Sequence, residues 1–175
     1  MSSVDLTRNL DLGEDNEKPL TQQFLTITSA KDLFALPIYH IKEIIGFDNL
    51  TEIPLMPPHI RGVINLRGAV VPVIDLSVRF GRSVTKIAKR TCIVILEIDQ
   101  DDSMQQLGIV VDAVNEVLTV DNNQLDRPPA FGTNIRDDFI SGILKKNEDF
   151  IIILDVSHVL SMEELQEITK NIEAS

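Results

Sequence analysis

The sequence contains no tryptophan, one tyrosine and one cysteine among its 175 residues. Phenylalanine, with seven copies, is the main aromatic residue, so the core has to be built mostly from aliphatic side chains. The single cysteine, Cys92, excludes an internal disulfide and fits a reducing, cytoplasmic compartment. No apolar run approaches the ~18 residues that indicate a membrane span, so we expect no direct membrane insertion.

Positive charge is also scarce. Sixteen Lys and Arg residues stand against 27 Asp and Glu residues, which gives a net charge of −11. Affinity for nucleic acid comes mostly from neutralising phosphates, so this balance argues against a nucleic-acid partner. It argues against an anionic membrane surface for the same reason.

Residues 1–19 differ from the rest of the chain in composition and in hydrophobic pattern. They hold five acidic and two basic residues, with no apolar periodicity and no apolar segment typical of a signal peptide. We therefore expect a flexible acidic N-terminal tail, followed by a folded part at 20–170.

From residue 21 onward, short runs rich in Val and Ile alternate with Gly, Asp, Asn and Pro. This spacing predicts a mainly β fold, a barrel or sandwich of several short strands. One helix is expected, at 161–170, because Ser161 and Glu164 have the spacing of a capping box.

The chain repeats an ordered set of motifs. Residues 60–64 and 73–77 have counterparts 80 positions later, both with the form Ile-x-Gly-apolar-apolar followed by apolar-Asp-apolar-Ser. A second match precedes each copy, since residues 34–44 resemble residues 107–117 at an offset of 73. The sequence therefore predicts two similar β modules.

We expect subdomain 1 at about residues 30–90 and subdomain 2 at about 91–160, the latter completed by a first strand at 21–28. An exposed basic connection near 82–91 joins them. A module of about 65 residues is near the lower limit for an independent core, so the two are expected to share an apolar interface.

The sequence offers little for catalysis. The three histidines are far apart, no metal-ligand spacing occurs, and phosphate-binding glycine loops are missing, so we expect neither metal nor cofactor. Cys92 lies in a strand-like run and is predicted to be a core residue. Asp75 and Asp155 occupy equivalent places in the repeat, which favours a structural role as acceptors of backbone N–H groups.

The two copies differ at one turn. The first carries Arg67 and Gly68 where the second has a polar hairpin at 145–148. Glycine here permits a positive φ or the close approach of another chain. We predict that Arg67 pairs with Glu43; an exposed ion pair is worth ~0–1 kcal/mol, so a role in orienting a binding edge explains it better than folding does.

Two long motifs carry a resemblance to a known family. Residues 60–76 (IRGVINLRGAVVPVIDL) and 107–118 (LGIVVDAVNEVL) resemble the two signatures of CheW, the coupling protein of bacterial chemotaxis. The resemblance covers about residues 21–168. It implies two SH3-like five-stranded β-barrels packed on a shared hydrophobic core, and no catalysis. It also implies a cytoplasmic adaptor, recruited to membrane-associated receptor arrays, that links the cytoplasmic tip of a chemoreceptor to the regulatory domain of the histidine kinase CheA.

The resemblance further implies partner-binding positions. Those where the family is sensitive to change are Ile41, Glu43, Gly62, Arg67, Gly68, Gly108 and Gly142. A groove for the receptor helix is expected near Val63, Val71 and Ile109, and a kinase contact at Arg127 and Phe131. For the glycines a purely conformational role stays open as an alternative.

Three other functions remain open. The same scaffold could serve a different chemosensory pathway, such as pili-dependent motility. It could be the adaptor half of a protein with a receiver domain, which the chain end at Ser175 disfavours. It could also be a small β-barrel enzyme that uses Cys92 or Asp75.

Overall fold

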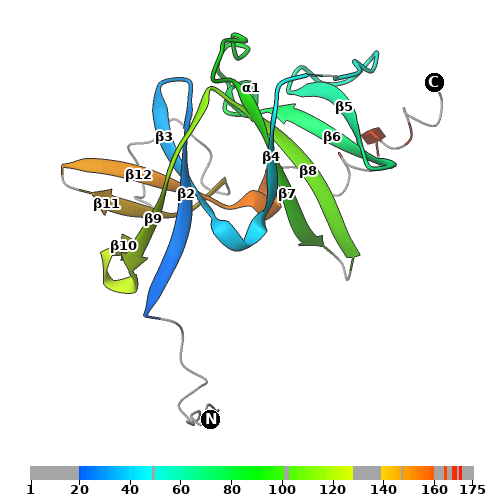
Figure 1. Ribbon diagram of the computed structural model, residues 1–175. Coiled ribbons are helices and arrows are strands. Elements are labelled where there is room, and N and C mark those ends of the chain that lie inside the picture. Colours follow the sequence, from blue (N-terminus) through cyan, green and yellow to red (C-terminus); the bar gives the residue numbers. More distant parts are fainter. Residues whose placement is uncertain are drawn as a thin grey trace.

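The computed structural model describes residues 20–48, 50–100, 103–127, 139–146, 148–159, 164, 167, 168 and 170. Its regular structure is mainly β, as predicted (Figure 1). The strands are β2 (Thr21–Ser29), β3 (Asp32–Pro37), β4 (Ile41–Gly46), β5 (Ile60–Leu66), β6 (Ala69–Asp75), β7 (Cys92–Gln100), β8 (Ser103–Val111), β9 (Ala113–Asp121), β10 (Leu125–Asp126), β11 (Ile140–Lys146) and β12 (Asp149–Leu154). Short helical turns are η3 (Ile38–His40), α1 (Leu76–Arg79), η4 (Asn122–Gln124) and η6 (Val156–His158).

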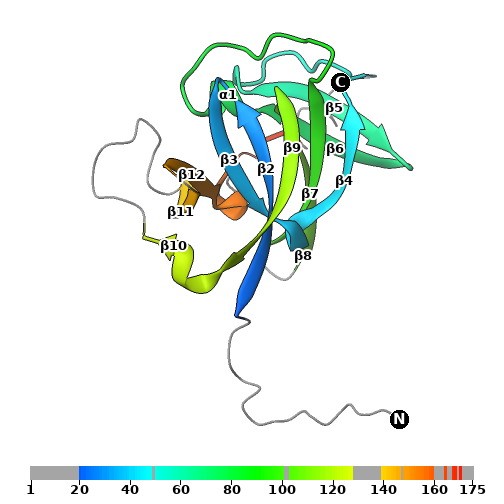
Figure 2. The same ribbon diagram turned by 60° about the vertical axis from the view of Figure 1, so that its left-hand side comes forward.

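The strands form two sheets that lie side by side (Figures 1 and 2). The β7 sheet has the order β4-β7-β8-β6-β5, and the β2 sheet has the order β10-β11-β12-β3-β2-β9. In the β2 sheet, β11 pairs with the edge strand β10. In the β7 sheet, the equivalent strand β5 has a corresponding partner in the isolated bridge between Val63 and Thr51. With that bridge counted, the two sheets have the same topology, which confirms two SH3-like subdomains.

The internal repeat of the sequence is a repeat of hydrogen-bond register. Ile60 faces Ile74 and Gly62 faces Val73 across a bulge, and 80 positions later Ile140 faces Leu154 and Gly142 faces Ile153 across the same bulge. The parallel pairs agree as well, since β6 lies beside β8 and β12 lies beside β3. The duplication is therefore confirmed strand by strand.

The division of strands between the sheets differs from the predicted modules. β2 does join β9–β12, as expected, but β3 lies in that sheet too, while β7 and β8 lie with β4–β6. The boundaries near residues 30 and 91 are thus corrected: the chain crosses between sheets after β3 and again after β8. The β2–β3 and β7–β8 hairpins stay intact, so each sequence repeat gives its first strand to the other sheet.

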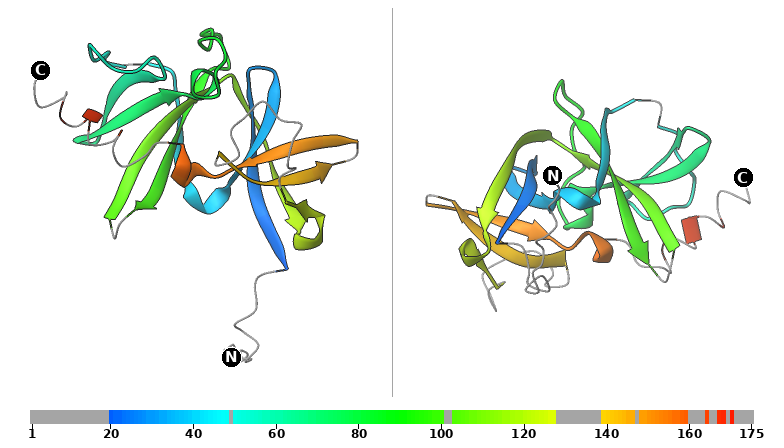
Figure 3. Two further views of the ribbon diagram at one scale, coloured as in Figure 1. Left: turned by 180° about the vertical axis from the view of Figure 1, so that it is seen from behind. Right: turned by 60° about the horizontal axis from the view of Figure 1, so that its bottom comes forward.

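Three apolar clusters hold the molecule together. One lies within the β7 sheet, around Val71 and Ile93, and one lies within the β2 sheet, around Phe24 and Ile151. The third is shared, because it joins β2 and β3 residues to β6, β7 and β8 residues. Both faces of the central strands β2, β3, β7 and β8 are therefore buried over part of their length, which explains their continuous apolar runs. The views from behind and from below show the two sheets lying against each other (Figure 3).

The predicted helix at 161–170 is partly within the described residues. Glu164, Glu167, Ile168 and Lys170 are helical, whereas Ser161 and the start of the capping box lie outside. Ile168 is buried in the shared cluster. The Glu164 carboxylate accepts two hydrogen bonds from Arg79, both at 3.0 Å. Ile168 is thus held by apolar packing, and Glu164 is held by charged contacts.

Candidate partner-binding surface

The predicted pair of Glu43 and Arg67 is present. The Arg67 Nη2 atom donates to Glu43 Oε2 at 2.7 Å, with the arginine side chain 67% exposed and the glutamate side chain 25% exposed. Glu43 lies on β4 and Arg67 at the β5–β6 turn, the two opposite edges of the β7 sheet. The pair therefore links the two edges of that sheet, and its arginine side chain remains accessible to a partner.

The turn that carries Arg67 is tightly defined. Arg67 and Gly68 both have positive φ, at 53° and 87°, as the two central residues of a type I′ hairpin turn require. The Asn65 side chain accepts from the Gly68 N–H at 3.0 Å. A left-handed conformation costs a non-glycine residue about 1–2 kcal/mol, so placing an arginine here suits binding better than stability.

The glycines expected at the site have mostly internal roles. A Cβ on Gly62 would lie 2.2 Å from the Thr51 carbonyl oxygen, and one on Gly142 would lie 3.1 Å from the equivalent oxygen of Asp126. A Cβ on Gly108 would meet the Ile93 side chain at 2.9 Å. These three glycines permit close packing, whereas Gly68 borders open space and serves the exposed turn.

The predicted groove needs correction. Val71 and Ile109 are 0% and 1% exposed, one inside the β7 sheet and one in the shared cluster. Neither can line an open groove, because strands with two buried faces hide both alternating sets of side chains. Val63 and Ile41 are half-buried against the shared cluster and offer part of their surface.

The predicted kinase contact is only partly described. Arg127 is exposed directly after β10, on the β2 sheet, away from the Glu43–Arg67 pair in the other sheet. Phe131 lies outside the described residues. The structure thus places Arg127 at the surface and does not bring it to the Glu43–Arg67 pair.

The β2 sheet carries a second, equivalent ion pair that sequence reasoning missed. Lys146 Nζ donates to Glu116 Oε2 at 2.8 Å. Glu116 is the counterpart of Glu43 at the offset of 73, and Lys146 lies in the β11–β12 hairpin that matches the Arg67 turn. Applying the repeat offsets to Glu43 would have found this pair.

Four exposed apolar side chains also follow the repeat. Ile44 and Val70 are 44% and 50% exposed, and their counterparts Val117 and Phe150 are 48% and 63% exposed. Val70 and Phe150 each precede a buried strand residue, whereas Ile44 and Val117 each lie beside a half-buried one. Exposed apolar side chains at matching places give both sheets a surface suited to protein contacts.

Reactive groups are engaged or shielded. The carboxylate of the buried Asp75 accepts hydrogen bonds from four donors, which belong to Arg61, Ser77 and Thr85. Cys92 is half-buried, and burial raises the pKa of its thiol, with Arg90 opposing that effect.

Among the described residues, no three His, Cys, Asp or Glu side chains come together as a metal site. The helices of this part of the chain are also too short or too polar to span a membrane.

Comparison with known proteins identifies the family. The family model of the CheW-like domain matches residues 23–164. The chain belongs to the CheW family. It is 33% identical to the chemotaxis protein CheW of Klebsiella aerogenes over 82% of this chain and 84% of that protein. It is 29% identical to CheW of Treponema pallidum over 83% and 86% of the two chains.

A solved relative agrees in fold. The scaffolding protein TtCheW from Thermoanaerobacter tengcongensis superposes with a TM-score of 0.74 at 34% identity, over 85% of this chain and 93% of that one. Membership of the CheW family supports a scaffold or adaptor in chemotaxis rather than an enzyme.

One titratable contact near the C-terminal residues gives a pH prediction. His59 Nε2 lies 3.0 Å from the Glu164 carboxylate, yet burial and then the Arg79 charge lower its pKa more than Glu164 raises it. Folding therefore disfavours protonated His59, and its contribution to stability is full above pH ~6.5 and is lost as pH falls below that value. We expect the free energy of unfolding to fall more between pH 7.5 and pH ~5.5 in the wild type than in His59→Gln.

Urea unfolding at the two pH values measures this difference. His158→Gln is the control, because His158 is an exposed side chain at the other sheet. An identical pH slope in the wild type and His59→Gln would contradict the prediction.

Proposed function

We propose that this protein is a non-catalytic adaptor that couples chemoreceptors to the histidine kinase CheA. Its partners are the cytoplasmic tip of the receptor and the regulatory domain of the kinase, and it acts in the cytoplasm at receptor arrays. The observation that carries the proposal is the exposed Glu43–Arg67 pair, built on a strained turn of a CheW-family scaffold.

Binding physics gives the mechanism. The exposed patches are small, which suits contacts that bury under ~1,200 Å² and are individually weak. Several such contacts within one array become strong through effective concentration. A receptor that presents different surfaces in its two signalling states would then shift the bound kinase between conformations.

Arg67→Glu is expected to weaken capture of the kinase regulatory domain or of the receptor tip about tenfold, because it places two carboxylates side by side where a partner now meets a paired charge. The fold should survive, since the side chain is 67% exposed. Pull-down titrations measure binding, and circular dichroism measures folding.

Two further variants sharpen the test. Lys146→Glu reverses the equivalent charge of the other sheet and serves as the matched control for a site-specific effect. The double swap Glu43→Arg with Arg67→Glu restores an ion pair in reversed orientation. Binding that stays weak in the swap supports direct contact of Arg67 with the partner, and undiminished binding by Arg67→Glu would contradict the proposal.

A CheW-like scaffold of another chemosensory pathway, such as pili-dependent motility, is the second candidate. Co-purification from cells separates the two, because the kinase that accompanies the protein identifies the pathway.

A further inference from the structure

The loop between α1 and β7 carries an unusual concentration of positive charge. Arg82, Lys86, Lys89 and Arg90 lie within nine residues, and the β2–β3 turn beside the loop adds Lys31. These five are a large share of the 16 basic residues in a chain of net charge −11. We call this surface, residues 82–90 with Ala30 and Lys31, the basic surface.

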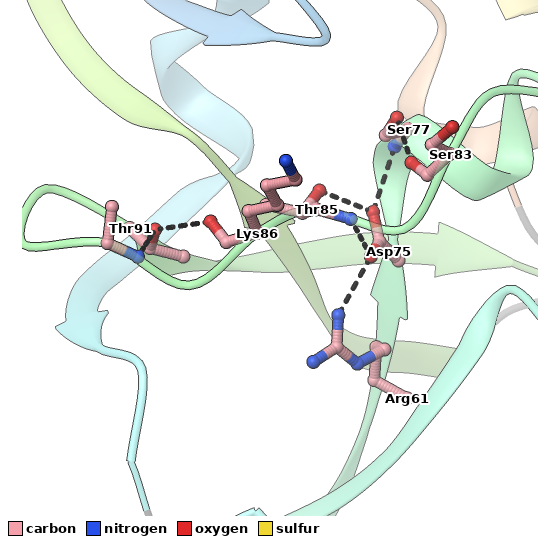
Figure 4. Close-up of polar contacts among 8 residues, drawn as sticks. Arg61, Asp75, Ser77, Ser83, Thr85, Lys86 and Thr91 are labelled. Carbon is pink, nitrogen blue, oxygen red and sulfur yellow. Dashed lines mark hydrogen bonds and ion pairs between the residues drawn. The ribbon is translucent and has the colours of Figure 1, made fainter.

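The loop has no regular secondary structure, yet buried hydrogen bonds hold it in place (Figure 4). Thr85 is 5% exposed, and its backbone N–H and hydroxyl both donate to Asp75, at 2.9 Å and 2.7 Å. The Ser77 hydroxyl donates to the Ser83 carbonyl at 2.6 Å. The loop conformation is therefore anchored to the end of β6.

A second set of contacts fixes the far half of the loop. The Ala88 N–H donates to the Thr91 hydroxyl at 2.8 Å, and that hydroxyl lies 3.4 Å from the Lys86 carbonyl (Figure 4). Anchoring at Thr85 and Thr91 keeps the side chains between them directed outward. The basic surface is thus preorganised, which lowers the entropic cost of binding.

Apolar side chains accompany the charges. Val84 and Ile87 are 57% and 50% exposed within this fixed loop. Val84, Arg82 and Lys86 border a cleft of about 370 Å³ whose other wall is the β2–β3 turn. The surface alternates basic and apolar groups, so its complement is a segment that alternates acidic and apolar residues.

Most of these cations have no acidic partner in the described part of the chain. Arg82 pairs with Asp32, and Asp112 accepts from the Ala30 N–H. No ion pair within the described residues engages Lys31, Lys86, Lys89 or Arg90. The basic groups of this surface are therefore available to pair with acidic groups of a partner.

The chain itself contains the complementary segment. Residues 4–12 read VDLTRNLDL, in which two apolar-acidic-apolar triplets, residues 4–6 and 10–12, flank Thr7, Arg8 and Asn9. β2 begins at one end of its sheet and reaches the β2–β3 turn at the other, about 30 Å away for a nine-residue strand (Figures 1 and 2). Nineteen extended residues span about 60 Å, so residues 4–12 can reach the basic surface of the same molecule.

We propose that residues 4–12 bind the basic surface of their own chain. Asp5 and Asp11 lie at lysines of the set Lys31, Lys86 and Lys89, and the apolar side chains lie against Val84 and Ile87. The sequence on its own favours a solvated tail. The sequence does not show that the basic surface is anchored, and that observation changes the expectation. Exposed ion pairs are individually weak, so the contact is a dynamic one that gains from tethering. A tether of this length gives an effective concentration of order mM.

Paramagnetic relaxation tests the contact in the full-length chain. A nitroxide attached at Ser3→Cys in a Cys92→Ser background should broaden the amide signals of Lys31 and of residues 82–89. Raising salt from 0.05 to 0.5 M should reduce that broadening about twofold or more, because the Debye length falls from roughly 14 Å to 4 Å.

Charge variants locate the site. Lys86→Glu with Lys89→Glu should abolish the broadening, whereas Lys42→Glu with Lys145→Glu, the same charge change at exposed positions of β4 and β11, should leave it. Dispersed amide spectra of every variant establish that each one is folded.

Three outcomes would overturn the proposal. The first is the absence of broadening at residues 82–89 in low salt. The second is broadening that survives the Lys86→Glu, Lys89→Glu change. The third comes from a mixture of isotope-labelled chain without nitroxide and unlabelled chain with it: broadening there as strong as in the doubly labelled chain would assign the surface to the tail of a second copy. The expected result is no broadening in the mixture.

Discussion

Asp75→Ala is expected to lower the free energy of unfolding by about 3–5 kcal/mol, because it leaves buried hydrogen-bond donors and the Arg61 guanidinium without their acceptor. Asp75 is fully buried and accepts from Arg61 at 2.9 Å, from the Ser77 N–H at 3.1 Å and from both Thr85 donors. Urea unfolding followed by circular dichroism measures the loss.

The repeat supplies the matched control. Asp155 occupies the equivalent place and accepts from the Ser157 N–H at 3.2 Å, but its side chain is 32% exposed. Water can replace the lost carboxylate there, so Asp155→Ala should cost only about 1 kcal/mol. Equal losses in the two variants would show that the buried network around Asp75 adds nothing. Loss of Asp75 also frees Thr85, so the same variant should loosen the basic surface.

The sequence predicted the parts of this fold that depend on local chemistry and on order along the chain. The repeat, the N–H-accepting aspartates and the Arg67–Glu43 pair all follow from residue types at fixed spacing, and each is confirmed. The repeat and the aspartates need no knowledge of which strand lies beside which, whereas the ion pair joins β4 to the β5–β6 turn at the opposite edge of the sheet.

Long-range pairing was the part that sequence reasoning could not supply. β3 and β8 exchange sheets relative to the repeat because each stays in a hairpin with its neighbour, β2 or β7, and each adds a parallel partner from a distant hairpin. A motif offset reveals similarity between segments but not their contacts. The predicted module boundaries failed for that reason.

Burial on both faces explains the other failure. Val71 faces the interior of the β7 sheet, and Ile109 faces the cluster shared between the sheets. In a half-exposed strand alternation separates core from surface, but here both alternate sets are apolar and buried. The sequence therefore marked these residues as apolar without showing that neither is accessible.

The basic surface illustrates a related limit. The run from Arg82 to Arg90 is visible in the sequence, but Lys31 joins it only because the β2–β3 turn folds beside the loop. Whether the loop is fixed depends on Asp75 and Thr85, ten residues apart and unremarkable as a pair in the sequence. The anchoring that makes this surface a candidate site required the structure.

Gly62→Ala is the second substitution with a large expected effect, a loss of about 3–4 kcal/mol in the free energy of unfolding. Gly62 has φ of 148°, and an added Cβ would lie 2.2 Å from the Thr51 carbonyl oxygen. Relief requires the Thr51 segment to move away from β5. That movement breaks the bridge in which Val63 and Thr51 exchange N–H···O bonds of 2.8 Å and 2.9 Å.

Alanine substitutions at two other glycines serve as references, because an added Cβ has more space at each of them than at Gly62. Gly142→Ala meets the Asp126 carbonyl oxygen at 3.1 Å, so a small shift relieves it and about 1–2 kcal/mol is expected. Gly68→Ala meets nothing within 4 Å and incurs only the cost of its positive φ, about 1 kcal/mol. If closure of the β7 sheet through Thr51 matters as argued, the losses follow the order Gly62, Gly142, Gly68. A Gly62→Ala protein as stable as Gly68→Ala would mean that this sheet holds together without its bridge.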